Sequence, residues 1–228
     1  MNAPVATLVL QVADTDESIE LGPFRAVVAG YTGRDAAQVQ HHIDELAAIG
    51  VAPPPQVPMI YPMPDGAVTS AAELTVNGDN TSGEVEPVLI RHAGRFYLGV
   101  GSDHTDRTLE TADIAESKAV CPKPIGETVV PIENWTAFDW DHCLVRSTVD
   151  GVVYQDGSLA GLRRPEELWD IVAERLDLAD DEDVVCFAGT LPLIDGAFVP
   201  GHDWELRIAL PDGRLLTHSY SITITKDI

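Results

Sequence analysis

Two short strand-like segments separated by a tight turn constrain the fold of this chain more than any other stretch. The segments cover residues 84–91 and 95–101, each is apolar in its middle, and the pair Ala93-Gly94 lies between them. Short apolar runs bounded by glycine are typical of β-strands, and strands joined by so short a connection lie antiparallel. The sequence therefore predicts a β-hairpin, and the residues at its open end are the first candidates for a functional site.

The rest of the chain is also expected to consist mainly of strands. Sixteen prolines and 18 glycines among 228 residues suit many short strands joined by tight turns. Asp150-Gly151 and Pro211-Asp212-Gly213 mark two more hairpins. The strands expected besides the first hairpin cover residues 6–12, 24–31, 72–76, 143–149, 152–155, 184–188, 204–210 and 214–225.

Helices are expected at three places. Asp35 is placed to cap a helix over residues 36–49, in which apolar residues recur at helical spacing. A second helix is expected over 165–178, and a short one over 108–118. Six prolines between residues 51 and 66 predict an extended segment rather than a helix.

The composition narrows the choice of partners and of compartment. Aspartate and glutamate number 37 against 14 lysines and arginines, so the formal net charge is −23, which disfavours binding to nucleic acid or to an anionic membrane. Cys121, Cys143 and Cys186 show no metal-ligand or redox spacing, so we expect reduced thiols in a cytoplasmic protein. We also expect no signal peptide and no membrane span, because no positive residue precedes the first apolar run and no apolar run is long enough.

Acidic residues gather at the open end of the predicted hairpin. Glu84 and Glu86 are two residues apart, so in a strand both carboxylates point to the same face. Two carboxylates on one face repel each other unless a positive charge lies between them. A hard divalent cation such as Mg²⁺ or Mn²⁺ takes oxygen ligands, and Asp103 could supply a third. The alternative is an exposed strand face, on which charged pairs are common.

Lys118 and two residues of the first helix are candidates for catalysis. Lys118, one of three lysines in the chain, is either a solvated loop residue or a group that stabilises negative charge beside a metal. His42 and Glu45 are three residues apart on a helix, so they form either an acid/base pair that activates water or an exposed polar face. We expect His104 to structure its loop rather than to bind metal.

At these residues the chain resembles the fumarylacetoacetate hydrolase superfamily, and within it the group called DUF2848. Glu84-Val85-Glu86 matches the superfamily's metal-binding E-x-E, and Asp103 falls at the metal ligand of its N-D-x-S-A-R-D loop, with Arg107 near the arginine of that loop. Lys118, followed by Cys-Pro-Lys-Pro-Ile-Gly, resembles the catalytic lysine and the proline-rich turn after it.

Three further segments carry the resemblance. Gln155 is similar to the glutamine of an N-G-x-x-x-Q segment, and Gly189-Thr190 is similar to the G-T-P substrate loop. Gly30-Tyr31, followed by His42 and Glu45, resembles the G-x-N-Y-x-x-H-x-x-E lid. The resemblance implies a mainly β (α+β) fold, a rolled mixed β-sandwich of the fumarylacetoacetate hydrolase type with short peripheral helices. It also implies one domain over 1–228, with N-terminal strands, lid helix and proline-rich segment in 1–66 and the catalytic β-roll in 67–228.

The resemblance also implies a function. The chain is expected to be a hydrolase or lyase that uses one Mg²⁺ or Mn²⁺ ion to break a carbon–carbon bond in a small 2-oxo or β-diketo acid, and to form a homodimer. The expected metal ligands are Glu84, Glu86 and Asp103, the catalytic residues His42, Glu45 and Lys118, and the substrate-binding residues Arg107, Gln155, Gly189 and Thr190. The alternatives are a hydratase, decarboxylase or isomerase with the same substrates, and a binding module for organic acids that catalyses nothing.

Overall fold

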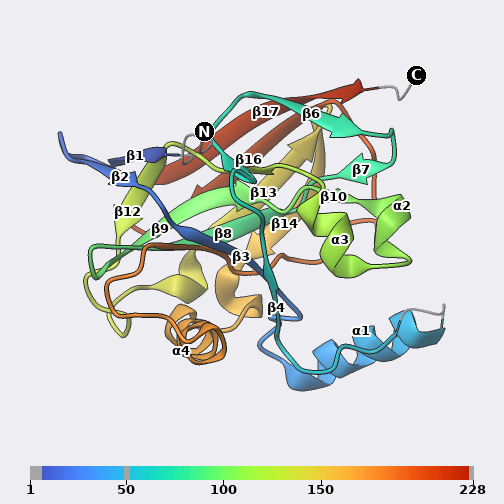
Figure 1. The fold of residues 1–228 in the computed structure, drawn as a ribbon, viewed down its shortest axis with the longest axis horizontal. Coiled ribbons are helices and arrows are strands. Elements are labelled where there is room, and N and C mark those ends of the chain that lie inside the picture. Colours follow the sequence, from blue (N-terminus) through green and yellow to red (C-terminus); the bar gives the residue numbers. More distant parts are fainter. Residues whose placement is uncertain (1–6, 49–51, 226–228) are drawn as a thin grey trace, which may run out of the picture.

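A large mixed sheet forms the centre of the molecule (Figure 1). The computed structural model describes residues 7–48 and 52–225, apart from the side chains of His42, Glu45, Leu46 and Ala48. Eight strands form the sheet in the order β2-β1-β12-β9-β8-β15-β3-β4. Their bounds are β1 Leu8–Val12, β2 Ser18–Leu21, β3 Arg25–Gly30, β4 Met59–Pro62, β8 Val85–His92, β9 Arg95–Ser102, β12 Thr128–Pro131 and β15 Val184–Phe187.

A second sheet of five strands packs against the first, in the order β14-β13-β16-β17-β6. Its strands are β6 Glu73–Asn77, β13 Leu144–Val149, β14 Val152–Ser158, β16 Asp203–Ala209 and β17 Leu215–Thr225. Two small two-stranded sheets pair β10 with β7 and β11 with β5. These short strands are β5 Val68–Thr69, β7 Thr81–Ser82, β10 Thr105–Asp106 and β11 Lys123–Pro124.

Short helices lie around the two sheets, and α1 extends away from the sheet body at the lower right of Figure 1. They are α1 Ala36–Ala48, α2 Arg107–Glu110, α3 Ile114–Ala119 and α4 Pro165–Leu176, with the 3₁₀ turns η1 Trp140–His142 and η2 Leu159–Gly161. The rolled, strand-rich α+β architecture predicted from the sequence is confirmed. None of the helices in the described residues is long and apolar enough to cross a membrane.

The central hairpin is buried on both of its faces. In β8, Val85 and Leu89 belong to the core between the two sheets, whereas Val88 and Ile90 belong to the core on the other face of the large sheet. Since side chains alternate along a strand, a strand buried on both faces is apolar on both, which explains the apolar residues Val88-Leu89-Ile90 in the middle of β8. Glu86, nearer the open end, is buried as well and is the exception. The hairpin is therefore fixed rigidly, and its open end with it.

One expected helix differs from the structure, and the segment expected to be extended contains a strand. The single helix predicted over 108–118 is broken into α2 and α3, because Asp113 caps the second one by accepting from the backbone N–H of Glu116 at 3.0 Å. The proline-rich segment 51–66 contains the edge strand β4, which antiparallel pairing joins to β3. Proline is tolerated there because an edge strand leaves one row of N–H groups unpaired.

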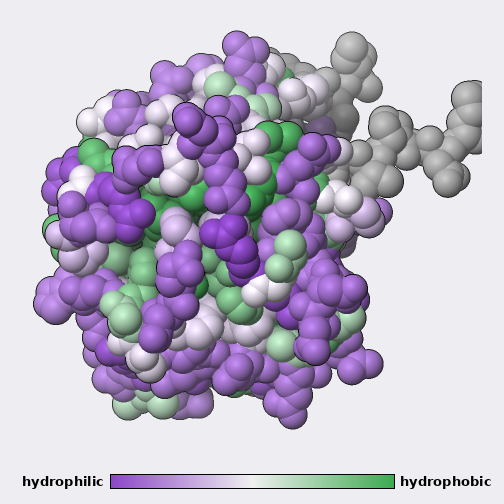
Figure 2. Space-filling model, turned by 90° about the vertical axis from the view of Figure 1, so that its left-hand side faces the viewer, coloured by the Kyte–Doolittle hydropathy of each residue, from purple (hydrophilic) through white to green (hydrophobic). Residues whose placement is uncertain are grey.

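The surface agrees with the strongly negative composition. Figure 2 shows a face covered mostly by hydrophilic residues, with hydrophobic residues visible between them. Cys121, Cys143 and Cys186 are buried and free, as expected for reduced thiols.

Candidate active site

The open end of the β8–β9 hairpin brings the three expected metal ligands together. Glu86 lies opposite Gly101 in the hairpin, and the N–H of Asp103 donates to the carbonyl of Glu84 over 3.0 Å. The three carboxylates influence one another. Burial is the main reason why the pKa of Glu86 is raised well above its usual range, and the negative charges of Asp103 and Glu84 raise it further. The sequence-based expectation that these acids meet at the mouth of one hairpin therefore agrees with the geometry.

Glu86 is a buried carboxyl group held by a glycine of the expected substrate loop. The residue is 2% exposed, and its Oε2 accepts from the backbone N–H of Gly189 at 2.9 Å. At Gly189 the φ angle is +99°, and a Cβ atom would lie 1.7 Å from Oγ1 of Thr32. Only glycine fits such a position, so the Gly189 loop is fixed against both Thr32 and Glu86.

Asp103 is shared by two lysines. Its Oδ2 accepts from Nζ of Lys118, and its Oδ1 lies 3.2 Å from Nζ of Lys123. Burial alone would raise the pKa of Asp103, but the two ammonium groups outweigh it and hold that pKa well below its usual range. The same pairing raises the pKa of Lys118 against the effect of its own burial, so Lys118 is charged at neutral pH.

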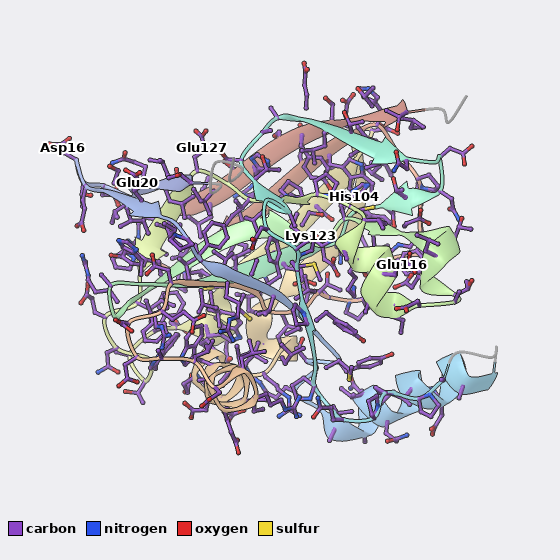
Figure 3. All side chains as sticks on the ribbon, viewed as in Figure 1. Asp16, Glu20, His104, Glu116, Lys123 and Glu127 are labelled. Carbon is purple, nitrogen blue, oxygen red and sulfur yellow. The ribbon has the colours of Figure 1, made fainter. Side chains whose placement is uncertain are left out.

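Lys123 was missed by the sequence reasoning. Its side chain is fully buried, and its Nζ also donates to the backbone carbonyls of His104, Lys118 and Cys121. Figure 3 shows Lys123 beside His104 at the inner side of α3. The sequence did contain a signal, because Lys123 stands between two prolines in a chain with only three lysines.

Arg107 is expected to bind substrate, but its guanidinium group contacts other protein groups. It donates to Oε2 of Glu84 at 3.0 Å, to Oγ of Ser82 at 2.6 Å and to both carboxylate oxygens of Glu110. Its Cζ atom lies over the ring of Phe198, 3.6 Å from the ring centroid. In this arrangement Arg107 fixes the orientation of Glu84, and direct contact with substrate stays a prediction.

Gln155 is likewise satisfied by the protein. Its Oε1 accepts from the N–H of Val85 and from Oγ of Ser147, and its Nε2 donates to Oγ1 of Thr190 and to the carbonyl of Leu191. The Thr190 hydroxyl in turn donates to the carbonyl of Val85 at 2.9 Å. These bonds attach the 189–191 loop to the open end of the hairpin, so Gln155 positions this loop, and its own contact with substrate stays a prediction.

The lid residues lie only partly within the described structure. Asp35 caps α1 as expected, since its Oδ1 accepts from the backbone N–H groups of Ala37 and Gln38. The side chains of His42 and Glu45 lie outside the described residues, so their catalytic role stays a prediction.

His104 does structure its loop. Its Nδ1 lies 3.2 Å from the Tyr220 hydroxyl and its Nε2 lies 2.9 Å from Oγ1 of Thr81. Both ring nitrogens are therefore engaged inside the protein, and the expectation that His104 is a loop residue rather than a ligand is supported.

Tyr61 is a second site residue that the sequence reasoning missed. Nζ of Lys118 lies 5.8 Å from the centroid of its ring. The tyrosine follows a proline-rich stretch, and no motif spacing connects residue 61 with residue 118, so only the fold shows that they meet.

A divalent cation fits this site by the chemistry of the donors. The three acids offer only carboxylate oxygens, which Mg²⁺ and Mn²⁺ prefer. Burial raises the pKa of one of them, Glu86, so a bound cation would favour its charged form. Within residues 7–48 and 52–225, no three His, Cys, Asp or Glu side chains are arranged to hold a metal ion. The ion pairs described above account for this absence. The carboxylate of Asp103 is paired with Lys118 and Lys123, and that of Glu84 is paired with Arg107, so these oxygens point at cationic side chains.

Comparison with solved structures shows the fold. The chain matches a fumarylpyruvate hydrolase from Pseudomonas aeruginosa, solved in complex with Mn²⁺ and pyruvate, at 18% identity over 99% of both chains with a TM-score of 0.66. A putative fumarylacetoacetate isomerase/hydrolase from Oleispira antarctica matches at 14% identity over 94% of this chain and 99% of its own, with a TM-score of 0.67. A 2-keto-3-deoxy-D-arabinonate dehydratase matches at 16% identity over 94% and 79%, with a TM-score of 0.61.

These similarities establish the fumarylacetoacetate hydrolase fold. They do not select a reaction, since the three proteins are named for different activities. No curated protein matches this chain. A family model described as a protein of unknown function, DUF2848, matches residues 29–220, which is well over half of the sequence, and the chain therefore belongs to the DUF2848 family.

Proposed function

We propose that this chain is a metal-dependent enzyme that breaks a carbon–carbon bond in a small 2-oxo or β-diketo acid. The observation that carries the proposal is the cluster at the hairpin mouth, where three carboxylates meet the buried ammonium group of Lys118. Charged groups are costly to bury, and buried ionisable groups with strongly shifted pKa values are typical of active sites. The fold supports the proposal, because proteins that share it are named as a hydrolase, an isomerase and a dehydratase.

Glu84, Glu86 and Asp103 would hold one Mg²⁺ or Mn²⁺ ion. When bound, such an ion polarises the carbonyl group of a substrate. Arg107 holds Glu84 in place through its 3.0 Å contact, and the N–H of Gly189 holds Glu86. Each of the two glutamates thus keeps one oxygen fixed by the protein.

Lys118 would stabilise negative charge. As the carbon–carbon bond breaks, charge develops on the keto oxygen of the substrate, and a nearby fixed ammonium lowers the energy of that state. Because the pKa of Lys118 is raised above its usual value, the ammonium does not lose its proton at neutral pH. The second partner of Asp103, Lys123, would keep the Asp103 carboxylate paired while Lys118 interacts with the substrate.

The remaining groups would orient the substrate and supply a proton. Thr190 lies in the loop that Gln155 attaches to the hairpin, so its position relative to Glu86 is fixed. The carboxylate of the substrate would bind to this loop. His42, oriented by Glu45, would deliver water or a proton from α1.

A screen of oxo acids for thermal stabilisation tests the proposal. A ligand that binds only the native state raises the melting temperature, so pyruvate and oxaloacetate should raise it only when Mn²⁺ is present. Glu86→Gln should abolish this rise, whereas Glu73→Gln, on an exposed position of β6, should keep it. Equal stabilisation of Glu86→Gln at matched Mn²⁺ would contradict the site.

The mass of the products separates the possible reactions. A gain of water indicates a hydrolase or hydratase, a loss of CO₂ a decarboxylase, and an unchanged mass an isomerase. Saturable binding with no turnover of any acid would indicate an organic-acid-binding module instead.

A further inference from the structure

Two tyrosines form a wall of the site for which the proposed function gives no role. Tyr61 lies in β4, and Tyr31 directly follows β3, the strand that pairs with β4. Both tyrosines lie in the electrostatic field of Lys118. The ring of Tyr61 is 5.8 Å from Nζ of Lys118, so this wall faces the same ammonium group as the carboxylates.

The backbone fixes this wall firmly. Tyr31 has a φ of +57°, a left-handed conformation that bulky residues rarely adopt. On one side of it, a Cβ atom at Gly30 would lie 3.1 Å from Cε2 of Tyr61, so glycine lets that ring approach the turn. On the other side, Thr32 packs against Gly189. Such strain persists only where the surroundings enforce it, and it concentrates at functional sites.

The two phenol groups are neutral and free to bind a ligand. Within the described part of the chain neither hydroxyl has a hydrogen-bond partner. Burial and then Glu110 raise the pKa of Tyr31, while burial and then Tyr31 raise the pKa of Tyr61 to about 12. Each hydroxyl therefore keeps its proton and can both donate and accept a hydrogen bond.

The surrounding charges decide which group these phenols can receive. Glu110 lies close enough to affect both tyrosines, and Arg107, which could offset that charge, is already bonded to Glu110 and Glu84. Lys118, the cation whose field reaches both tyrosines, is paired with Asp103 and serves the oxo-acid end of the substrate. A second substrate carboxylate would thus be buried beside Glu110 with no further cation to pair with it, which is costly. A neutral hydroxyl meets no such repulsion, and it can accept from one phenol and donate to the other.

We propose that Tyr31 and Tyr61 are specificity-determining residues that bind a hydroxyl group at the end of the substrate remote from its carboxylate. The substrates are then hydroxylated 2-oxo acids rather than alkyl oxo acids or oxo diacids. This inference rests on the proposed function, because it assigns the oxo-acid end of the substrate to the carboxylate and lysine cluster.

Binding measurements with three acids test the inference. Calorimetric titration in the presence of Mn²⁺ compares 4-hydroxy-2-oxobutyrate with 2-oxobutyrate, which lacks only the hydroxyl oxygen, and with oxaloacetate, which carries a second carboxylate. We expect the protein to prefer the hydroxylated acid by about tenfold over both others, since two hydrogen bonds are gained and each is worth roughly a factor of 2 to 10.

Removing one phenol oxygen at a time should reduce that preference. Tyr31→Phe and Tyr61→Phe should each lower the affinity for 4-hydroxy-2-oxobutyrate by roughly 2- to 10-fold and leave the affinity for 2-oxobutyrate unchanged. Tyr97→Phe is the matched control and should keep the preference, because Tyr97 is a buried tyrosine of β9 that belongs to the same hydrophobic core as Tyr61. If one variant fails to fold, the other decides by itself, since each phenol is expected to contribute.

Unchanged preference in both folded variants would overturn the inference, and so would tighter binding of oxaloacetate than of the hydroxylated acid. If the unmodified protein binds none of the three acids with Mn²⁺ present, the proposed function fails and this inference fails with it. Binding of 2-oxobutyrate without a preference for the hydroxylated acid leaves the proposed function standing and removes only the role of the tyrosines.

Discussion

Single residues at this site carry unusually concentrated charge. Asp103 is 1% exposed and is paired with both Lys118 and Lys123. Removing one partner of a buried ion pair leaves an uncompensated charge, and this costs more than the pair contributes. Lys123 also bonds three backbone carbonyls, so it joins the Asp103 loop to the segment that carries Lys118.

Lys123→Met should destabilise the protein by about 3–5 kcal/mol, because the methionine fills the space and leaves the carbonyls and Asp103 with fewer partners. Urea unfolding measures this loss. The matched control is Arg146→Met, which removes the exposed partner of Asp156 and should cost less than about 1 kcal/mol. Equal losses in the two variants would contradict a structural role of Lys123.

Lys118→Met should lower turnover by about 100- to 1000-fold, because it removes a fixed charge at the position where negative charge develops. Its Mn²⁺ affinity should be kept or increased, since no ammonium then competes for Asp103. Calorimetry with Mn²⁺ and assay of the substrate found in the screen give the two quantities. Full turnover in this variant would contradict a catalytic role of Lys118.

The sequence predicted the acids and Lys118 because they lie in linear motifs around one hairpin. It did not predict that Lys123 binds Asp103 and several backbone carbonyls, because these groups become neighbours only after β11 pairs with β5. The roles of Arg107 and Gln155 in fixing Glu84 and Thr190 likewise depend on contacts across 23 and 35 residues. Contacts between residues so far apart cannot be predicted from their spacing along the chain.

At the level of elements, apolar runs and turn residues were enough to predict most of the strands. The main hairpin, the last hairpin and β15 lie within one or two residues of their expected places, and β14 extends three residues beyond its expected end at residue 155. Strands β2 and β12 were missed, since each has only four residues and offers too short a pattern to identify a strand. Both are stabilised by their pairing with β1, which is a tertiary effect.

Replacing a buried side chain of the hairpin by alanine should destabilise the protein strongly. Leu89→Ala removes a fully buried side chain of β8 and should cost about 2–5 kcal/mol of unfolding free energy, because a cavity remains. Leu144→Ala, on β13 at 58% exposure, makes the same chemical change at the surface and should cost far less. Urea unfolding of both variants checks the difference, and equal losses would contradict the central place of β8.

His218, on strand β17, should make the free energy of unfolding decrease as the pH falls. Burial lowers the pKa of His218 in the folded protein, and its Nε2 is buried without a hydrogen-bond partner. As the pH falls below the unfolded value of about 6.5, the unfolded chain binds a proton that the folded chain resists, so stability drops by at most about 1.4 kcal/mol per pH unit. His218→Gln should reduce this slope between pH 7 and pH 5, while His202→Gln, an exposed histidine, should leave it unchanged.

At the level of the whole molecule, we expect repulsion among the acidic residues to outweigh the attraction within the ion pairs. The formal net charge of −23 disfavours the compact state. Added NaCl screens this repulsion over a Debye length of about 10 Å at 0.1 M, so the melting temperature should rise as salt increases from dilute buffer. A fall in melting temperature over that range would show that the attractive ion pairs outweigh the repulsion.

The order of strands in the large sheet means that the N-terminal segment and the rest of the chain cannot fold separately. Residues before 67 supply β1, which lies against β12, and β3, which lies against β15. A fragment beginning at residue 67 would keep every acid of the cluster and Lys118, yet it would expose the unpaired edges of two buried strands. Such a fragment should precipitate when made alone and should recover when co-expressed with its missing N-terminal portion.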